Sequence, residues 1–230
     1  MAKTISPFDL IPMDIFTQDF PSKIHLAYQK DEPPNIFGKI YPDEARLWLH
    51  KDLAAIVLLA SQRVEQHSLI LYDGLRTVEA QALMSQSDIV KDNPHWLEEP
   101  GRLLSPPGGG AHPRGMAIDL SVIDKRGELL DMGTDFDFLA EDSSPAHNPA
   151  HREYPHINEV VQANRDLLTQ AMVSAASDLG LQILPLPQEW WDFRFPADIY
   201  EAYEPLSDAE VPETHAEALR NEIIGKIKNL

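Results

Sequence analysis

The chain has 230 residues, no cysteine and a formal net charge of −18. Its length suits one domain with a substantial core. The absence of cysteine excludes disulfides, thiol nucleophiles and cysteine zinc clusters, so any metal must be held by His, Asp or Glu. The acidic excess argues against nucleic acid and anionic membrane surfaces as partners. The N-terminal residues contain no apolar run of the kind found in signal peptides or membrane spans, so a cytoplasmic location is expected.

The first part of the chain predicts an irregular arm followed by a helix. Residues 1–42 are rich in proline and aromatic residues, with one short strand expected at 24–27. The aromatic side chains are expected to pack this arm onto the core; the alternative is that they form a wall of a peptide site. A helix is expected from Asp43 to about Gln66, because acidic residues suit its first turn and a broad apolar face follows.

The middle of the chain alternates short strands, turns and helices. A strand is expected at 69–72, followed by a turn at Asp73-Gly74 and by a helix over 77–84 with Thr77 as its N-cap. Residues 88–110 are expected to form a loop. A strand over 116–122, a hairpin turn at 124–127, a partner strand at 128–132 and a loop over 133–155 are expected next.

The last part of the chain predicts a long helix, short strands and a tail. The long helix spans 158–179, with Asn158 as N-cap and Gly180 after its end. Strands are expected at 181–184 and 190–195. A narrow apolar stripe in the tail is expected to pack on the body or on a second subunit as a homodimer; it consists of Ala216, Leu219, Ile223, Ile224 and Ile227.

Together these elements predict an α+β fold, in which helices flank a small antiparallel sheet. We expect one main domain over residues 1–203, which contains the candidate catalytic residues, and a tail with an amphipathic helix over 204–230.

The segment 108–121 carries the first candidate for chemistry. Three glycines precede His112, and Asp119 lies within an apolar strand. A carboxylate buried without a partner would be costly. A metal ion and an arginine are both reasonable partners for Asp119 on these residues alone.

Two further segments add candidate residues. Glu189 and Asp192 flank two tryptophans that could exclude water and raise the pKa of Glu189, which suits a general base or acid. The alternative is an edge strand with a surface carboxylate pair. Arg76 follows a tight turn and could stabilise an oxyanion or form a structural ion pair with Asp73 or Glu79.

These motifs in combination resemble the zinc D-alanyl-D-alanine dipeptidases of the VanX type. The resemblance extends over about residues 8–200 and implies a fold like that of the DD-peptidases and hedgehog proteins. It is carried by Asp-Gly-Leu-Arg at 73–76, His-Pro-Arg-Gly-Met-Ala-Ile-Asp at 112–119, Met-Gly-Thr-Asp-Phe-Asp-Phe at 132–138, Asn-Arg at 164–165 and Glu-Trp-Trp at 189–191.

The resemblance implies a role for each matching residue. His112 and Asp119 match the first two metal ligands, and Glu189 matches the base that activates the attacking water. Arg76 matches the arginine that stabilises the oxyanion, and Asp137 matches the carboxylate that binds the free ammonium of the dipeptide. The implied activity is metal-dependent hydrolysis of D-Ala-D-Ala or a related D-amino-acid dipeptide in cell-wall turnover.

The chain departs from the family pattern at the metal. The family's third ligand is a histidine three residues after the glutamate, where this chain has Asp192. Asp192 can itself ligate zinc, although a His/Asp/Asp set also suits Mn²⁺ or another divalent ion. The alternatives are a histidine from the segment that contains His147, His151 and His156, or a site that has lost tight metal binding.

A second departure precedes the first ligand, because Gly110 and Ala111 replace the family's serines and put specificity for D-Ala-D-Ala in question. The alternative function is a catalytically impaired relative that binds a peptide or cell-wall fragment.

Overall fold

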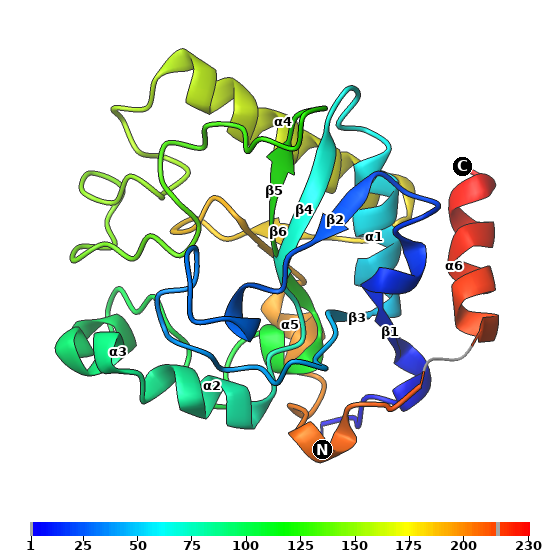
Figure 1. The fold of residues 1–230 in the computed structure, drawn as a ribbon, viewed down its shortest axis with the longest axis horizontal. Helices are drawn as coiled ribbons and strands as arrows, with labels where there is room; N and C mark the ends of the chain where they lie inside the picture. The colour runs from blue at the N-terminus through cyan, green and yellow to red at the C-terminus, as the bar shows by residue number, and fades with distance from the viewer. Residues whose placement is uncertain (1, 215–216) are drawn as a thin grey trace.

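The computed structural model describes residues 2–214 and 217–230. Its centre is a five-stranded sheet in the order β2-β4-β5-β7-β6, made of Ser22–Ile24, Ser68–Asp73, Ala117–Ile123, Asp192–Arg194 and Leu184–Pro185 (Figure 1). All neighbouring strands are antiparallel except β2, which runs parallel to β4. The expected α+β class with a small antiparallel sheet is confirmed, with one parallel strand at its edge.

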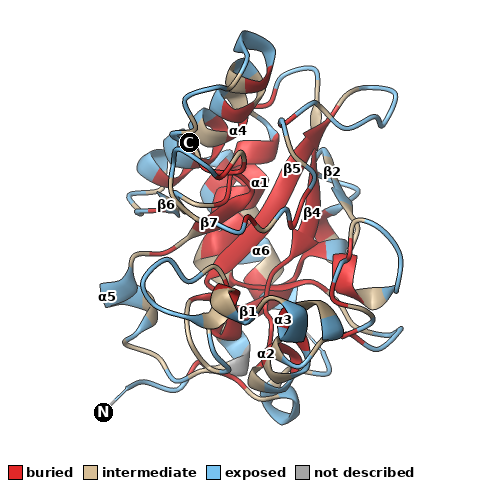
Figure 2. Ribbon diagram, turned by 90° about the vertical axis from the view of Figure 1, so that its left-hand side faces the viewer, coloured by how far each residue is buried: buried red, intermediate tan, exposed pale blue. Residues whose placement is uncertain are grey.

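The two central strands form the core of the molecule. Every residue of β5 is buried, and so is every residue of β4 after Ser68. Figure 2 shows them as a continuous buried band with exposed segments around it. Strands covered on both faces read as unbroken apolar runs, which is why both were recognisable in the sequence.

Two helices pack together on the sheet. They are α1 (Lys51–Ser61) and α4 (Glu159–Asp178), which contact each other, and α4 also contacts β5. The cap of α4 is as predicted, since the Asn158 side chain accepts a hydrogen bond from the Val161 amide at 2.9 Å. Gly180 follows the helix with φ +68°.

The helix expected from Asp43 begins only at Lys51. Residues 48–50 instead form β3 (Trp48–His50), which pairs antiparallel with β1 (Leu10–Pro12). Both segments are wholly buried. A short apolar run such as 47–49 is compatible with a buried helix and with a buried strand, so the pattern alone could not distinguish them. The partner strand is more than thirty residues away in the sequence and could not be seen from local pattern.

Helix α2 (Val78–Ser85) matches its prediction, and the Thr77 hydroxyl accepts a hydrogen bond from the Ala80 amide. The expected loop over 88–110 contains a short helix, α3 (Asp88–Asp92). The expected strand over 128–132 is wrong, because only Leu129 forms an isolated bridge, to Ile123. The strand expected at 181–184 is reduced to β6.

The C-terminal segment contains α5 (Ala197–Tyr200) and α6 (Glu217–Lys228). Helix α6 lies beside α1 at the edge of the molecule (Figure 1). Its side chains Leu219, Ile223 and Ile227 are buried against the same chain. Ala216 lies outside the described residues. The stripe therefore packs on the body, and it adds no support for a homodimer.

Short 3-10 helices complete the fold: η1 (Pro7–Asp9), η2 (Met13–Phe16), η3 (Ala27–Gln29), η4 (Pro94–Leu97), η5 (His112–Arg114) and η6 (Asp208–Glu210). Within residues 2–214 and 217–230, none of the helices combines the length and hydropathy needed to cross a bilayer.

Candidate active site

Three buried aspartates lie side by side on neighbouring strands. Asp73 at the end of β4 is the register partner of Asp119 on β5, and Asp119 is the partner of Asp192 on β7. Each is at most 2% exposed. Like charges directly opposite one another destabilise a sheet, and buried carboxylates need partners. The sheet therefore requires cations at this point.

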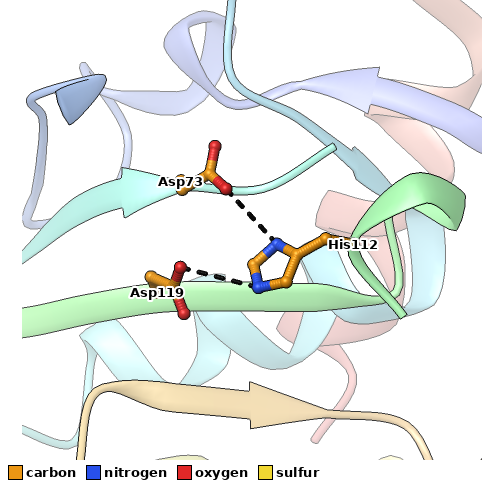
Figure 3. A group of neighbouring side chains, drawn as sticks. All are labelled: Asp73, His112 and Asp119. Carbon is orange, nitrogen blue, oxygen red and sulfur yellow. Dashed lines mark ion pairs between the residues drawn. The ribbon is translucent and has the colours of Figure 1, made fainter. Parts of the chain in front are cut away.

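His112, from η5, supplies one positively charged or metal-binding group. Its Nδ1 lies 2.8 Å from the Gly74 carbonyl oxygen, and its Nε2 lies 3.3 Å from Asp192 Oδ2 and 3.5 Å from Asp119 Oδ2. Figure 3 shows the ring between the carboxylates of Asp73 and Asp119. Burial opposes protonation, but the adjacent carboxylates outweigh it and raise the pKa of His112 to about 10.

Gly74 makes this arrangement possible. A Cβ at this position would lie 2.7 Å from the Trp48 carbonyl oxygen, so only glycine fits where the turn passes β3. The turn holds the Gly74 carbonyl against His112 Nδ1. Because Nδ1–H donates to this carbonyl, Nε2 is left as the nitrogen that can bind a metal.

Arg76 compensates the first two aspartates. Its Nε donates to Asp73 Oδ2 at 2.9 Å, and its Nη2 lies 3.4 Å from Asp119 Oδ2. Its guanidinium also lies over the Tyr28 ring, 5.2 Å from the centroid. The ion pair with Asp73 anticipated from the sequence is present. It leaves the guanidinium inside the cavity, where an oxyanion could also be bound.

The donor set fits a divalent cation. Ligand atoms of Asp73, His112 and Asp119 lie within 4.8 Å of one another. Asp73 is not in the predicted set, and it lies on the Nδ1 side of His112, 3.4 Å from a nitrogen that is hydrogen-bonded to the Gly74 carbonyl. Asp119 Oδ1, by contrast, is buried with no partner among the described residues. On this ground the Nε2 side of His112 is the better place for a metal, with Asp119 beside it.

Asp192 lies on that same side but is engaged by another residue. Arg194 Nε donates to Asp192 Oδ1 at 2.7 Å, and Arg194 Nη2 donates to Asp192 Oδ2. Burial opposes ionisation of Asp192, but Arg194 and His112 outweigh it and hold its pKa below the usual range. Each carboxylate oxygen has two lone pairs, so the bidentate pair does not exhaust the acceptor capacity of Asp192.

Glu189 lines the same cavity without a hydrogen bond to its carboxylate among the described residues. It is 8% exposed. Burial, reinforced by the charges of Asp192 and Asp119, raises the pKa of Glu189 to about 8. The alternative of an edge strand with a surface carboxylate pair is wrong, because β7 lies between β5 and β6 and Asp192 is fully buried.

Asp137 lies in the cavity as well. Its Oδ1 accepts a hydrogen bond from the Tyr28 hydroxyl at 3.1 Å, and its Oδ2 is buried without a partner in the described chain. Burial raises the pKa of Asp137 well above its ordinary value, and the nearby Asp119 adds to the shift. A buried carboxylate oxygen without a partner can accept a hydrogen bond from a cationic group.

Comparison with known proteins is decisive at this point. The model of the D-ala-D-ala dipeptidase family of peptidases matches residues 10–212. The chain belongs to this family. A curated relative, the D-alanyl-D-alanine dipeptidase of Escherichia coli (strain K12), is 33% identical over 191 residues, which cover 82% of this chain and 85% of the relative. The resemblance inferred from the motifs is thereby confirmed, and the protein is an enzyme of the dipeptidase class.

The segment in which this dipeptidase departs from its family pattern, Gly110 and Ala111, lies beside another serine. Gly110 has no side chain, and a Cβ there would lie 3.0 Å from Ser105 Oγ. Ser105 therefore brings a hydroxyl to the edge of the same cavity. The glycine segment is held in place by Gln81, which bonds Gly108 and Gly109, and by Arg114.

The three histidines considered as substitute ligands do not line the cavity. His147 is exposed and lies 2.8 Å from Asp142, and His156 is exposed beside Tyr154. His151 is buried, but its Nδ1 accepts a hydrogen bond from the amide two residues on, at 3.0 Å. Of these four candidates for the third ligand, Asp192 is therefore the one that lines the cavity.

Sequence reasoning missed Tyr28, Tyr41 and Arg194. The N-terminal arm packs its aromatic side chains onto the core except for Phe8, which is 71% exposed, and Tyr28 also forms part of the cavity wall. Neither tyrosine carries a local signal, because each contacts residues far away in the sequence. Arg194 could have been found, since residues i and i+2 of a strand share a face and Asp192 needed a cation.

Proposed function

We propose that this dipeptidase hydrolyses D-Ala-D-Ala or a related small D-amino-acid dipeptide. The proposed metal is Zn²⁺, with Mn²⁺ as the alternative, held by His112, Asp119 and Asp192. When bound there, the metal would polarise the scissile carbonyl and acidify the attacking water. The name of the curated relative supports the substrate, and the unpartnered Asp119 oxygen supports the metal.

Glu189 is the proposed general base. Its carboxylate has no competing hydrogen bond, and its pKa of about 8 suits a group that accepts and returns a proton near neutrality. In this proposal Glu189 takes a proton from the attacking water and delivers it to the leaving amine. Tyr28 and Trp191 form the aromatic part of the cavity wall, and Phe136 packs against both rings.

Arg76 and Asp137 are proposed to position the substrate. The Arg76 guanidinium, fixed by Asp73, would stabilise the oxyanion that develops on the carbonyl oxygen. Asp137 would bind the free ammonium of the dipeptide through its unpartnered oxygen. An ammonium site inside the cavity restricts the substrate to peptides with a free amine at the right distance from the scissile bond.

One observation gives the proposal its main support. Nε2 of His112 faces oxygens of Asp119 and Asp192 in a cavity that also contains Glu189 and Asp137. A larger hollow of about 390 Å³ lies beside Leu75 and Trp48, but its lining includes none of these five groups.

The test is metal content of the purified protein by elemental analysis, followed by D-Ala-D-Ala hydrolysis after Zn²⁺ or Mn²⁺ is restored. One metal per chain with turnover supports the proposal. One metal without turnover would redirect the substrate search to other dipeptides. Failure to bind any divalent metal would favour a catalytically impaired relative that binds a peptide.

A further inference from the structure

The contact between Asp192 and Arg194 is unusual in its position. Both residues lie on β7, two residues apart, and the guanidinium donates to both oxygens of the carboxylate. The Arg194 side chain is 18% exposed and lines the same cavity as His112 and Glu189. A bidentate guanidinium–carboxylate pair fixes both the charge and the orientation of the carboxylate.

The charges around the metal position explain why such a pair is needed. A histidine at position 192 would add no charge to a ligand set of His112 and Asp119. Asp192 adds one negative charge, and Arg194 adds one positive charge within hydrogen-bond distance. His112, Asp119, Asp192 and Arg194 together therefore carry the same net charge as His112, Asp119 and a histidine at 192 would carry with no cation at 194. Arg194 cannot lose its proton, so this compensation is permanent.

We propose that Asp192 and Arg194 act as one unit in place of a histidine ligand, with Arg194 as the positioning residue that sets the metal affinity of Asp192. This inference rests on the proposed function, because it takes Asp192 as a metal ligand. The pairing also changes the expected effect of substituting histidine at position 192 alone. Asp192→His alone would leave the Arg194 guanidinium partly buried, unpaired and beside a divalent cation.

The experiment measures the Zn²⁺ dissociation constant by competition with a chromophoric chelator. The proteins are the wild type, Arg194→Gln, Arg194→Lys, Asp192→His and the double variant Asp192→His/Arg194→Gln. The matched control is Arg46→Gln, which breaks a bidentate pair with Asp14 that is not part of the cavity. Thermal unfolding of each metal-free protein checks that the variants fold.

Removing a positive charge next to a divalent cation should tighten binding, so Arg194→Gln is expected to bind Zn²⁺ about tenfold more tightly. Arg194→Lys loses the bidentate contact but keeps the positive charge, and it should remain within about threefold of wild type because the charge is the larger effect on Zn²⁺ affinity. Asp192→His should bind about tenfold more weakly because it leaves the guanidinium uncompensated. The double variant should return to within about threefold of wild type, because removing the guanidinium relieves the repulsion that weakens Zn²⁺ binding in Asp192→His.

Two results would overturn the inference while leaving the metal site intact. The first is that Arg194→Gln changes Zn²⁺ affinity no more than Arg46→Gln does. The second is that the double variant binds Zn²⁺ as weakly as Asp192→His does, because an unpaired guanidinium would then not be the cause of the weaker binding. If Arg194→Gln does not fold, Arg194→Lys and the double variant decide the question in the same way. If the wild-type protein binds neither Zn²⁺ nor Mn²⁺, the proposed function fails and this inference fails with it.

Discussion

Replacing Glu189 by glutamine should stabilise the metal-free protein while removing its activity. In the folded chain the pKa of Glu189 is raised from 4.5 to about 8, chiefly by burial. A raised carboxyl pKa means that the folded state holds the proton more tightly than the unfolded state. The folded state is therefore progressively penalised as the pH rises from about 4.5 to about 8. One pKa unit corresponds to about 1.4 kcal/mol, so the penalty reaches about 3 kcal/mol at pH 7.

The assay is urea denaturation with a chelator present, at several pH values between 4.5 and 8. Glu189→Gln keeps the shape of the side chain and removes its charge, so its gain in unfolding free energy over wild type should grow with pH. Glu98→Gln, at an exposed carboxylate, is the matched control. With metal restored, kcat of Glu189→Gln should fall by about 10²- to 10⁴-fold.

The reasoning would be refuted if Glu189→Gln and Glu98→Gln had the same pH-dependent stability. Retained kcat in Glu189→Gln would separately remove this residue from the mechanism. The two readouts are independent, because one concerns the metal-free protein and the other concerns turnover.

Three further predictions address the substrate site, pH and the tail. Asp137→Asn should raise KM for a free dipeptide by about tenfold or more and leave an N-acetylated dipeptide unaffected; equal effects on both would exclude an ammonium site. Burial lowers the pKa of His50, so the free energy of unfolding falls as the pH falls below 6.5. His50→Asn can still cap α1 and should make the free energy of unfolding, measured in urea titrations, depend less on pH in this range. Ile223→Ala should cost about 2–5 kcal/mol of unfolding free energy with no change in solution mass; a halved mass would instead place α6 in a dimer interface.

The sequence pattern predicted an element correctly where the interactions that form the element lie within a few residues of one another. The strand at β5, the Thr77 cap of α2 and the Asn158 cap of α4 are all visible in the sequence, because apolar runs and capping oxygens act within a few residues. The pattern failed at β3, whose pairing with β1 depends on a distant segment. It failed again at residues 128–132, where a hairpin turn is followed by only a single bridge.

The sequence by itself determined the family and the chemical groups of the site, because those groups occur in motifs with fixed spacing. His112, Asp119, Glu189, Arg76 and Asp137 were all named from these motifs, and all five line one cavity.

Only the tertiary structure decided the charge balance of that cavity. The register of β4, β5 and β7 sets three aspartates side by side, and Arg76, His112 and Arg194 compensate them. Residues far apart in the chain share this electrostatic environment because the sheet brings them within a few ångströms. Electrostatic interactions depend on distance and burial in space, and spacing along the sequence specifies neither.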